Sequence, residues 1–118
     1  MIGYRVVEIR NGKVMSLFHG TNGSREIYLN IWNAADKKPV QDGSGKKNRY
    51  ISGWHFLQSR EECEKFFDKM FRVKKNRYVV LCIVRGNIRA KHTEDFRGNP
   101  CWLADEIFIP GFAVAGLL

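Results

Sequence analysis

The sequence lacks any long apolar run, and no stretch approaches the roughly 18 apolar residues that a membrane-spanning helix needs. Residues 1–5 also lack the charged-then-apolar layout of a secretory signal. Cysteine is scarce: Cys63, Cys82 and Cys101 are far apart, and no two form the Cys-x-x-Cys pair typical of zinc or dithiol chemistry. We therefore expect a cytoplasmic protein without membrane contact, in which each cysteine is a small buried side chain.

Two common ligand-binding motifs are missing as well. Residues 43–46 (Gly-Ser-Gly-Lys) are close to a phosphate-binding P-loop, but the upstream glycine of that loop would fall on Val40, and Lys47 stands where Ser or Thr is required. No spacing around His55 and His92 supports a metal site. The sequence therefore argues against a P-loop and predicts no metal cofactor.

What the sequence does contain is an excess of positive charge, because 20 Lys and Arg against 12 Asp and Glu give a net charge of +8. Binding is stabilised when Lys and Arg neutralise phosphates, so the charge favours a polyanionic partner, either a nucleotide or a nucleic acid. A host protein is the other partner that we expect. The alternative is that each basic cluster is a solvated loop or helix end. The residues that we expect to contact a polyanion are Lys46, Lys47, Arg49, Lys74 and Lys75.

The size and composition predict one folded domain over residues 1–118. With 44% hydrophobic and 13% aromatic residues, the chain can bury enough apolar surface to offset the loss of chain entropy. Residues 36–49 are polar and predict a flexible loop. Residues 111–118 form an apolar tail that either packs on the core or provides a contact surface.

The first elements that the sequence predicts are the two strands of a β-hairpin. Residues 4–10 and 13–19 are strand-like, and the Asn11-Gly12 pair between them suits the two positive-φ positions of a type I′ turn. The second strand ends at His19, where glycines and small polar residues follow. Residues 25–35 have a mixed pattern that fits either a strand or a short helix.

The most regular pattern is that of one amphipathic helix over residues 59–72. Ser59 and Glu62 form a capping box, in which the Ser hydroxyl accepts from the backbone of Glu62 and the carboxylate reaches back. An apolar stripe then follows at helical spacing. Its members are Cys63, Phe66, Phe67, Met70 and Phe71.

The helix stripe needs an apolar partner, and residues 78–84 provide it. They are apolar on both alternating faces and rich in β-branched side chains, which is typical of a central strand. Residues 104–109 predict a final strand, closed by Pro110. Together the elements predict a compact α+β fold, a mainly antiparallel β-sheet opened by the hairpin with the helix packed on it.

Three short segments carry the candidate chemistry. Residues 17–21 (Leu-Phe-His-Gly-Thr) end a strand, residues 53–56 (Gly-Trp-His-Phe) precede the capped helix, and residues 105–108 (Asp-Glu-Ile-Phe) begin an apolar strand. In this order they resemble the three signature segments of the ADP-ribosyltransferase fold, in its poly-ADP-ribose polymerase-like branch. The resemblance implies a split β-sheet and NAD as the cofactor.

The resemblance also implies roles for particular residues. His19 would bind the ribose on the nicotinamide side, Gly20 would bind the carboxamide, and Glu106 would stabilise a ribosyl cation. His55 stands where the family has tyrosine, which leaves the catalytic step in question. The implied cofactor-binding residues are His19, Gly20, Thr21 and Trp54, and the implied catalytic residues are His55 and Glu106.

Each of these segments also has a purely structural interpretation. A His before Gly at a strand end, as at His19, is commonly a cap or turn residue, and Gly53 can serve only to bend the chain into its helix. Glu106 can simply alternate outward beside a buried Ile107.

A looser similarity covers more of the chain. Residues 4–7, 16–20, 52–56 and 103–106 together look like small uncharacterised proteins of bacteriophages and their hosts. That similarity implies a host-modifying or counter-defence role in a bacterial or phage-infected cell. Three hypotheses therefore stay open: an NAD-dependent enzyme, a non-catalytic basic module that binds nucleic acid or a nucleoprotein, and a phage structural or assembly protein.

Overall fold

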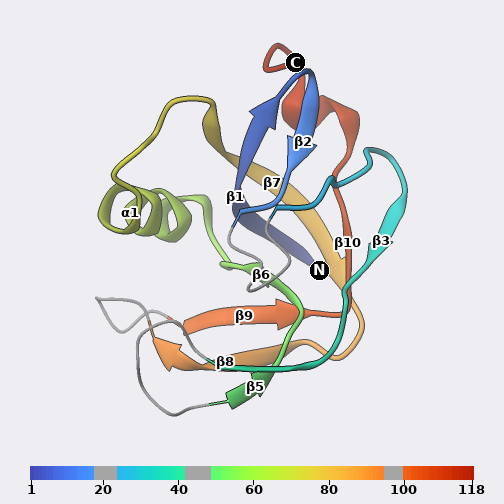
Figure 1. Cartoon of the computed structure of the whole chain (residues 1–118), viewed down its shortest axis with the longest axis vertical. Helices are drawn as coiled ribbons and strands as arrows, with labels where there is room; N and C mark the ends of the chain where they lie inside the picture. The colour runs from blue at the N-terminus through green and yellow to red at the C-terminus, as the bar shows by residue number, and fades with distance from the viewer. Residues whose placement is uncertain (18–23, 42–48, 95–99) are drawn as a thin grey trace.

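The chain begins with the expected β-hairpin, in which β1 (Ile2–Arg10) pairs antiparallel with β2 (Lys13–Met15). Asn11 and Gly12 have φ angles of 53° and 73°, as the two central positions of a type I′ turn require. The computed structural model describes residues 1–17, 24–41, 49–94 and 100–118 (Figure 1). The second strand is shorter than expected, because it ends at Met15.

β1 belongs to a five-stranded sheet with the order β2-β1-β7-β10-β3. All its pairings are antiparallel, and β7 (Arg77–Arg85) is central, as the apolar run of residues 78–84 predicts. On the other side of β7 lies β10 (Glu106–Phe108), followed by the edge strand β3 (Trp32–Ala34). The mixed pattern of residues 25–35 therefore contains a short strand.

A second sheet has three antiparallel strands in the order β6-β9-β8. It lies at the lower end of the molecule in Figure 1, across from the hairpin tip. Its strands are β6 (Trp54–Phe56), β8 (Arg89–Glu94) and β9 (Pro100–Ala104). The two sheets and the helix make a compact α+β fold with a curled, half-barrel sheet, which confirms the expected fold class.

A short ribbon of β4 (Pro39–Gln41) and β5 (Arg49–Ile51) occupies the described ends of the expected loop over residues 36–49, whose residues 42–48 lie outside the described residues. The backbone of Ser52 donates to the carbonyl of Lys38 at 2.9 Å, which extends the pairing beyond the strands. Cross-strand hydrogen bonds satisfy backbone groups here even though the local sequence is polar and favours turns.

The expected strand over residues 104–109 is divided at Asp105, where the chain leaves one sheet for the other. The backbone of Asp105 donates to the Gly86 carbonyl and accepts from the amide of Ala35. Its carboxylate binds Arg89 at 3.1 Å and Lys37 at 3.4 Å. These contacts come from distant segments, so the local alternation of apolar residues does not reveal the break.

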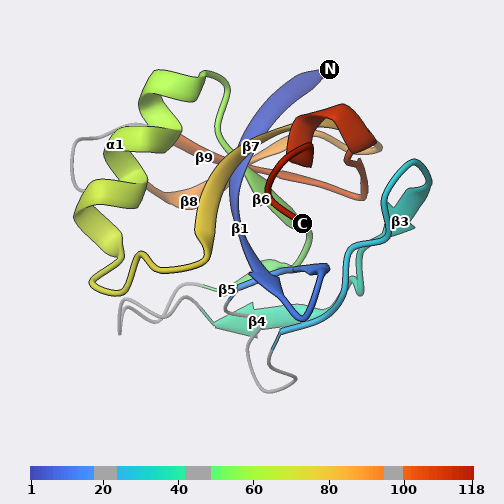
Figure 2. The same ribbon diagram turned by 90° about the horizontal axis from the view of Figure 1, so that it is seen from above.

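The helix α1 (Arg60–Met70) is capped as expected, because the Ser59 hydroxyl accepts from the backbone of Glu62 at 3.1 Å. It packs on β1 and β7, on the face that we call outer (Figure 2). Cys63 and Phe71 are buried there, and Phe66 and Phe67 are half-buried. Met70 was expected in this stripe but is 47% exposed, because it lies in the last turn, at the edge of the contact.

The inner face of the five-stranded sheet packs against the second sheet. Val7, Val80 and Cys82 share one apolar cluster with Trp54 and Phe56 of β6. The strands approach so closely that a Cβ on Gly3 would lie 2.6 Å from the Phe56 ring, which explains the glycine.

The C-terminal residues close this core. A short 3-10 helix, η2 (Gly111–Val114), places Val114 in the inner cluster, with Ala113 and Leu117 packed against it. Phe112 points away and is 75% exposed. The apolar tail therefore packs in part. Within the described residues, no helix is long and apolar enough to cross a membrane.

Loss of the Phe71 ring is expected to lower the free energy of unfolding by about 3–5 kcal/mol, because Phe71→Ala leaves a cavity among buried side chains. The matched control is its neighbour Met70, which is 47% exposed, so Met70→Ala is expected to change stability by less than about 0.5 kcal/mol. Urea denaturation of both variants measures the difference. Equal losses would show that the helix packs differently.

Candidate functional site

The candidate site centres on Trp54, one of the residues that the ADP-ribosyltransferase resemblance implies for cofactor binding. The fold buries it between the two sheets. Trp54 is 2% exposed, and its indole N–H donates to the backbone carbonyl of Asn33 at 2.9 Å. Asn33 is itself fixed, because its side chain accepts from the backbone of Tyr28 and donates to that residue's carbonyl, both at 2.9 Å. The indole is therefore held rigidly at one edge of the inner cluster.

Arg5, which is not one of the site residues that the sequence predicts, lies against this indole. Its guanidinium carbon is 5.5 Å from the centre of the Trp54 ring, and the residue is only 5% exposed. The guanidinium donates two long hydrogen bonds, to the carbonyls of Val6 at 3.5 Å and of His55 at 3.3 Å. No carboxylate among the described residues forms an ion pair with it.

A second guanidinium, that of Arg25, lies 4.8 Å from the same indole. Its backbone is held by Ser16, whose hydroxyl accepts from the Arg25 amide at 3.0 Å and donates to the Arg25 carbonyl at 3.1 Å. Arg25 is exposed and, like Arg5, has no carboxylate partner within the described part of the chain. Two cations therefore approach one ring.

Burial of Arg5 without a carboxylate is energetically unfavourable. Burial holds the pKa of Arg5 below its ordinary value, because desolvation disfavours the charged form. A guanidinium has five N–H donors, and buried donors normally find partners. An anion that reached this guanidinium would supply both the missing charge and the missing acceptors, which makes Arg5 the strongest ligand-binding candidate in the described structure.

The resemblance also implies cofactor binding by His19, Gly20 and Thr21. These three residues lie outside the described residues. Ser16 and Arg25, which are joined by the hydrogen bonds above, flank this stretch closely on its two sides. Arg25 in turn lies beside the Trp54 ring.

His55 follows Trp54 in β6 but its ring lies on the opposite side of the strand, since Trp54 and Phe56 both point into the inner cluster. The His55 Nε2 lies 3.4 Å from the Tyr50 hydroxyl, and the two rings make an edge-on contact with centres 5.9 Å apart. Lys91 lies 4.9 Å from the Tyr50 ring. The backbone carbonyl of His55 accepts a hydrogen bond from Arg5.

Beside Tyr50, an open cavity of about 450 Å³ separates the β4–β5 ribbon from the second sheet. Its lining includes Lys37 and Arg89. Both cations bind Asp105, and Arg89 also donates to the carbonyls of Ser52 and Ile51 at 3.0 and 3.2 Å. These partners satisfy the cations, so the cavity is a weaker candidate than the Arg5 site.

Glu106 lies on the outer face of the five-stranded sheet. Its neighbour Ile107 is fully buried in the inner cluster, so alternation along β10 turns Glu106 outward. Its carboxylate binds Arg85 at 3.1 and 3.4 Å. The described structure therefore brings Trp54, Arg5 and the backbone of His55 together, and places the Glu106 side chain on the other side of the sheet.

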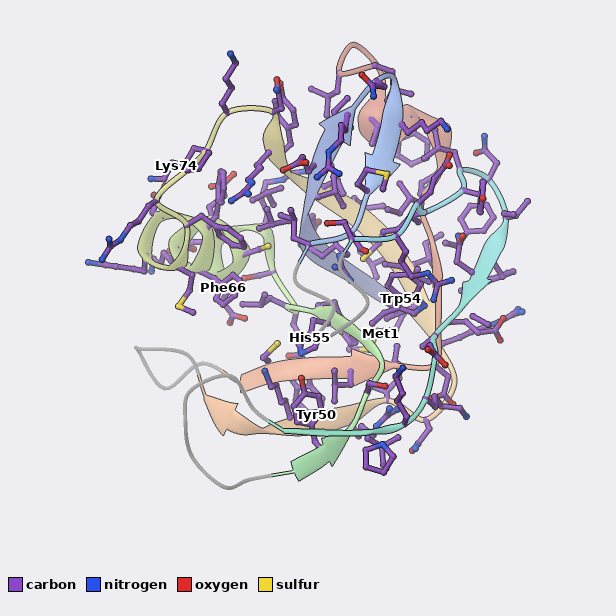
Figure 3. All side chains as sticks on the ribbon, viewed as in Figure 1. Met1, Tyr50, Trp54, His55, Phe66 and Lys74 are labelled. Atoms are coloured by element: carbon purple, nitrogen blue, oxygen red, sulfur yellow. The ribbon has the colours of Figure 1, made fainter. Side chains whose placement is uncertain are left out.

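Three of the basic residues expected to bind a polyanion lie within the described part of the chain. Lys46 and Lys47 lie outside the described residues, and Arg49 begins β5. Lys74 and Lys75 lie in the exposed turn after α1, where Lys74 binds Asp68 at 3.2 Å. Figure 3 shows Lys74 at the upper left, beside α1, and Tyr50, the neighbour of Arg49, at the lower centre.

Metal-ligating clusters are absent from the described part of the chain, where no three His, Cys, Asp or Glu side chains lie close enough to hold an ion. Cys63, Cys82 and Cys101 are buried and form no disulfide, as the expectation of small buried side chains requires.

Comparisons with protein-family models, with curated proteins and with solved structures found no match for this chain. The resemblance to ADP-ribosyltransferases therefore rests on the three short segments of the sequence and stays a prediction.

Arg5 was missed although the sequence carries a signal for it. In the alternating pattern of β1, Gly3, Arg5 and Val7 share the inner face, so Arg5 is a lone charge in an otherwise apolar register. A charged residue on a buried face needs an oppositely charged partner, and the inward-facing residues of the neighbouring strand β7 include no carboxylate.

The buried thiols of Cys63 and Cys82 predict that the free energy of unfolding declines at alkaline pH. Burial raises the pKa of Cys63 and of Cys82 to about 12. Since the unfolded thiols titrate near pH ~8.5, their contribution is complete below that pH and is lost as pH rises toward about 12. We expect the free energy of unfolding, measured by urea denaturation, to fall over this window. The fall should be smaller in Cys63→Ala/Cys82→Ala, and an equal fall would contradict the assignment.

Proposed function

We propose that the chain is a nucleotide-binding domain of the ADP-ribosyltransferase type, whose ligand presents a phosphate group to Arg5 and Arg25 beside Trp54. The observation that carries the proposal is the Arg5 guanidinium, 5% exposed and without a carboxylate partner in the described residues. Buried cations of this kind are normally paired, and a bound anion provides the pairing.

The rest of the site supports a nucleotide over a free inorganic anion. Two guanidiniums contact the indole of Trp54, and the residue that carries one of them, Arg25, is exposed. Binding sites for small molecules commonly combine an apolar lining with a few fixed polar groups. NAD fits this chemistry, since it carries two phosphates between aromatic bases and riboses.

The segment resemblance adds the identity of the nucleotide. Residues 18–23, which contain His19, Gly20 and Thr21, are flanked by Ser16 and Arg25, and Arg25 already contacts the Trp54 ring. The described flank of the first segment, Arg25, and the second segment, through Trp54, are therefore in contact. The third segment contributes Ile107 to that cluster, while Glu106 faces the other way.

Calorimetric titration with NAD and ADP-ribose tests the binding. We expect Arg5→Met to weaken both ligands by roughly 10-fold to 150-fold, because hydrogen bonds to a charged group are each worth about 1.5–3 kcal/mol. The fold should persist, since Met replaces a buried charge with an apolar side chain. The matched control is Lys75→Met, which removes one exposed charge and should change affinity less than about 2-fold.

Wild-type affinity in Arg5→Met would refute the proposed site. An RNA oligonucleotide is the comparison ligand. Tight RNA binding that is lost in Lys74→Ala/Lys75→Ala and kept in Arg5→Met would instead favour a nucleic-acid-binding module.

Nicotinamide release from NAD tests the catalytic part of the hypothesis. If Glu106 acts as the resemblance implies, Glu106→Gln keeps the fold and NAD affinity but loses turnover, because an amide cannot stabilise a developing cation. Arg85→Gln is the control, since it removes the ion-pair partner and leaves the carboxylate in place. NAD binding by the wild type without any nicotinamide release would leave a binding domain without this chemistry.

A further inference from the structure

The indole N–H of Trp102, in β9, is buried, and no acceptor among the described residues receives a hydrogen bond from it. The residue packs against the inner cluster. Buried donors normally have a partner, because an N–H that has lost its water without gaining an acceptor destabilises the fold. An acceptor is therefore expected at this position.

Trp102 points to the inner face of the second sheet, the face that carries Trp54. In the register of β6 and β9, Phe56 lies opposite Trp102, and Trp54 lies opposite Ala104. Phe56, Trp54 and Ala104 all belong to the inner cluster. Trp102 and Trp54 are therefore diagonal neighbours on adjacent strands, and such neighbours are about 7–8 Å apart, within reach of aromatic side chains.

Arg5 approaches the same place from the other edge of β6. This strand pairs with β9 along one edge, and along the other its end at Leu57 exchanges hydrogen bonds with Tyr4 of β1. Arg5 and Trp102 are thus two strand spacings apart, about 10 Å between their backbones, and both side chains point inward. Burial holds the pKa of Arg5 below its ordinary value, and the thiol of Cys101 is among the groups that oppose this effect. Because Cys101 directly precedes Trp102, this part of β9 lies near the guanidinium.

The two groups require different things of a ligand. An indole N–H is a donor only, so Trp102 requires an acceptor, whereas Arg5 requires a negative charge as well as acceptors. A water molecule can accept from both groups, but it leaves the buried charge uncompensated. A nucleotide offers both features, since its phosphate is linked through a ribose to a base whose carbonyl oxygens or ring nitrogens accept hydrogen bonds.

We infer that Trp102 is a second ligand-binding residue of the Arg5 site, and that its indole N–H donates to the base of the nucleotide whose phosphate binds Arg5. The inference rests on the proposed function, because it assigns a further contact to the same ligand. A site built to hydrogen-bond a ligand group rejects analogues that lack the group. Arg5 therefore provides affinity for phosphate, and Trp102 distinguishes a nucleotide from other phosphates.

The indole N–H signals in an NMR spectrum of the nitrogen-labelled chain test this contact directly. The sequence has three tryptophans, and the variants Trp32→Phe and Trp102→Phe assign their signals. On saturation with ADP-ribose, we expect the Trp102 signal to move downfield and its exchange with water to slow, because the donor gains an acceptor. The Trp32 signal should stay in place, since Trp32 lies on the edge strand β3 against Phe108 and Arg85.

Calorimetry then separates the base from the phosphate. Trp102→Phe keeps an aromatic ring and removes the N–H, so we expect it to weaken ADP-ribose by roughly 2-fold to 12-fold, the value of one neutral hydrogen bond. Its affinity for inorganic pyrophosphate, which has no base, should stay at the wild-type value. Arg5→Met should weaken both ligands. Trp32→Phe is the matched control and should change neither affinity.

Three results would overturn the inference while the proposed function stands on the Arg5→Met result. These are an unmoved Trp102 signal in the complex with ADP-ribose, wild-type affinity for ADP-ribose in Trp102→Phe, and an equal loss of both ligands in that variant, which would show a structural role. A wild-type chain that does not bind ADP-ribose would overturn the inference and the proposed function together.

Discussion

The backbone junction between Tyr4 and Leu57 is the contact on which the architecture depends. The two residues exchange hydrogen bonds of 2.9 and 2.8 Å, and so join the first strand of one sheet to the end of β6 in the other. The absence of a Cβ at Gly3 allows Phe56 to pack beside this junction. One contact thus sets Trp54 against Arg5 on the inner face and directs the chain toward α1 on the outer face.

Local patterns were sufficient to predict the elements whose stability is local. The Asn11-Gly12 turn, the cap at Ser59 and the apolar run of β7 all depend on neighbours in the sequence, and all three are confirmed. The break at Asp105 depends instead on Gly86, Arg89 and Lys37, which are distant in the chain. The strands of residues 36–49 likewise form through pairing, against their local preference for turns.

The site was predictable only in part, because the side of the sheet to which a side chain points depends on the register of its strand. Alternation along β10 already allowed Glu106 to point outward, and the structure shows that it does. Trp54 and His55 are adjacent in sequence and lie on opposite sides of β6. Arg5 becomes significant only once the inner face is known, since an arginine in a strand is common on an exposed surface.

The isolated charge of Arg5 has a consequence for the lifetime of the protein. An anion that binds only the folded chain lowers the fraction of unfolded molecules, and proteases act mainly on that fraction. If the proposed anion binds Arg5, the chain without it carries an uncompensated buried cation and unfolds more often than the bound chain. The amount of protein that persists in a cell would then follow the concentration of its ligand, without any dedicated regulatory element.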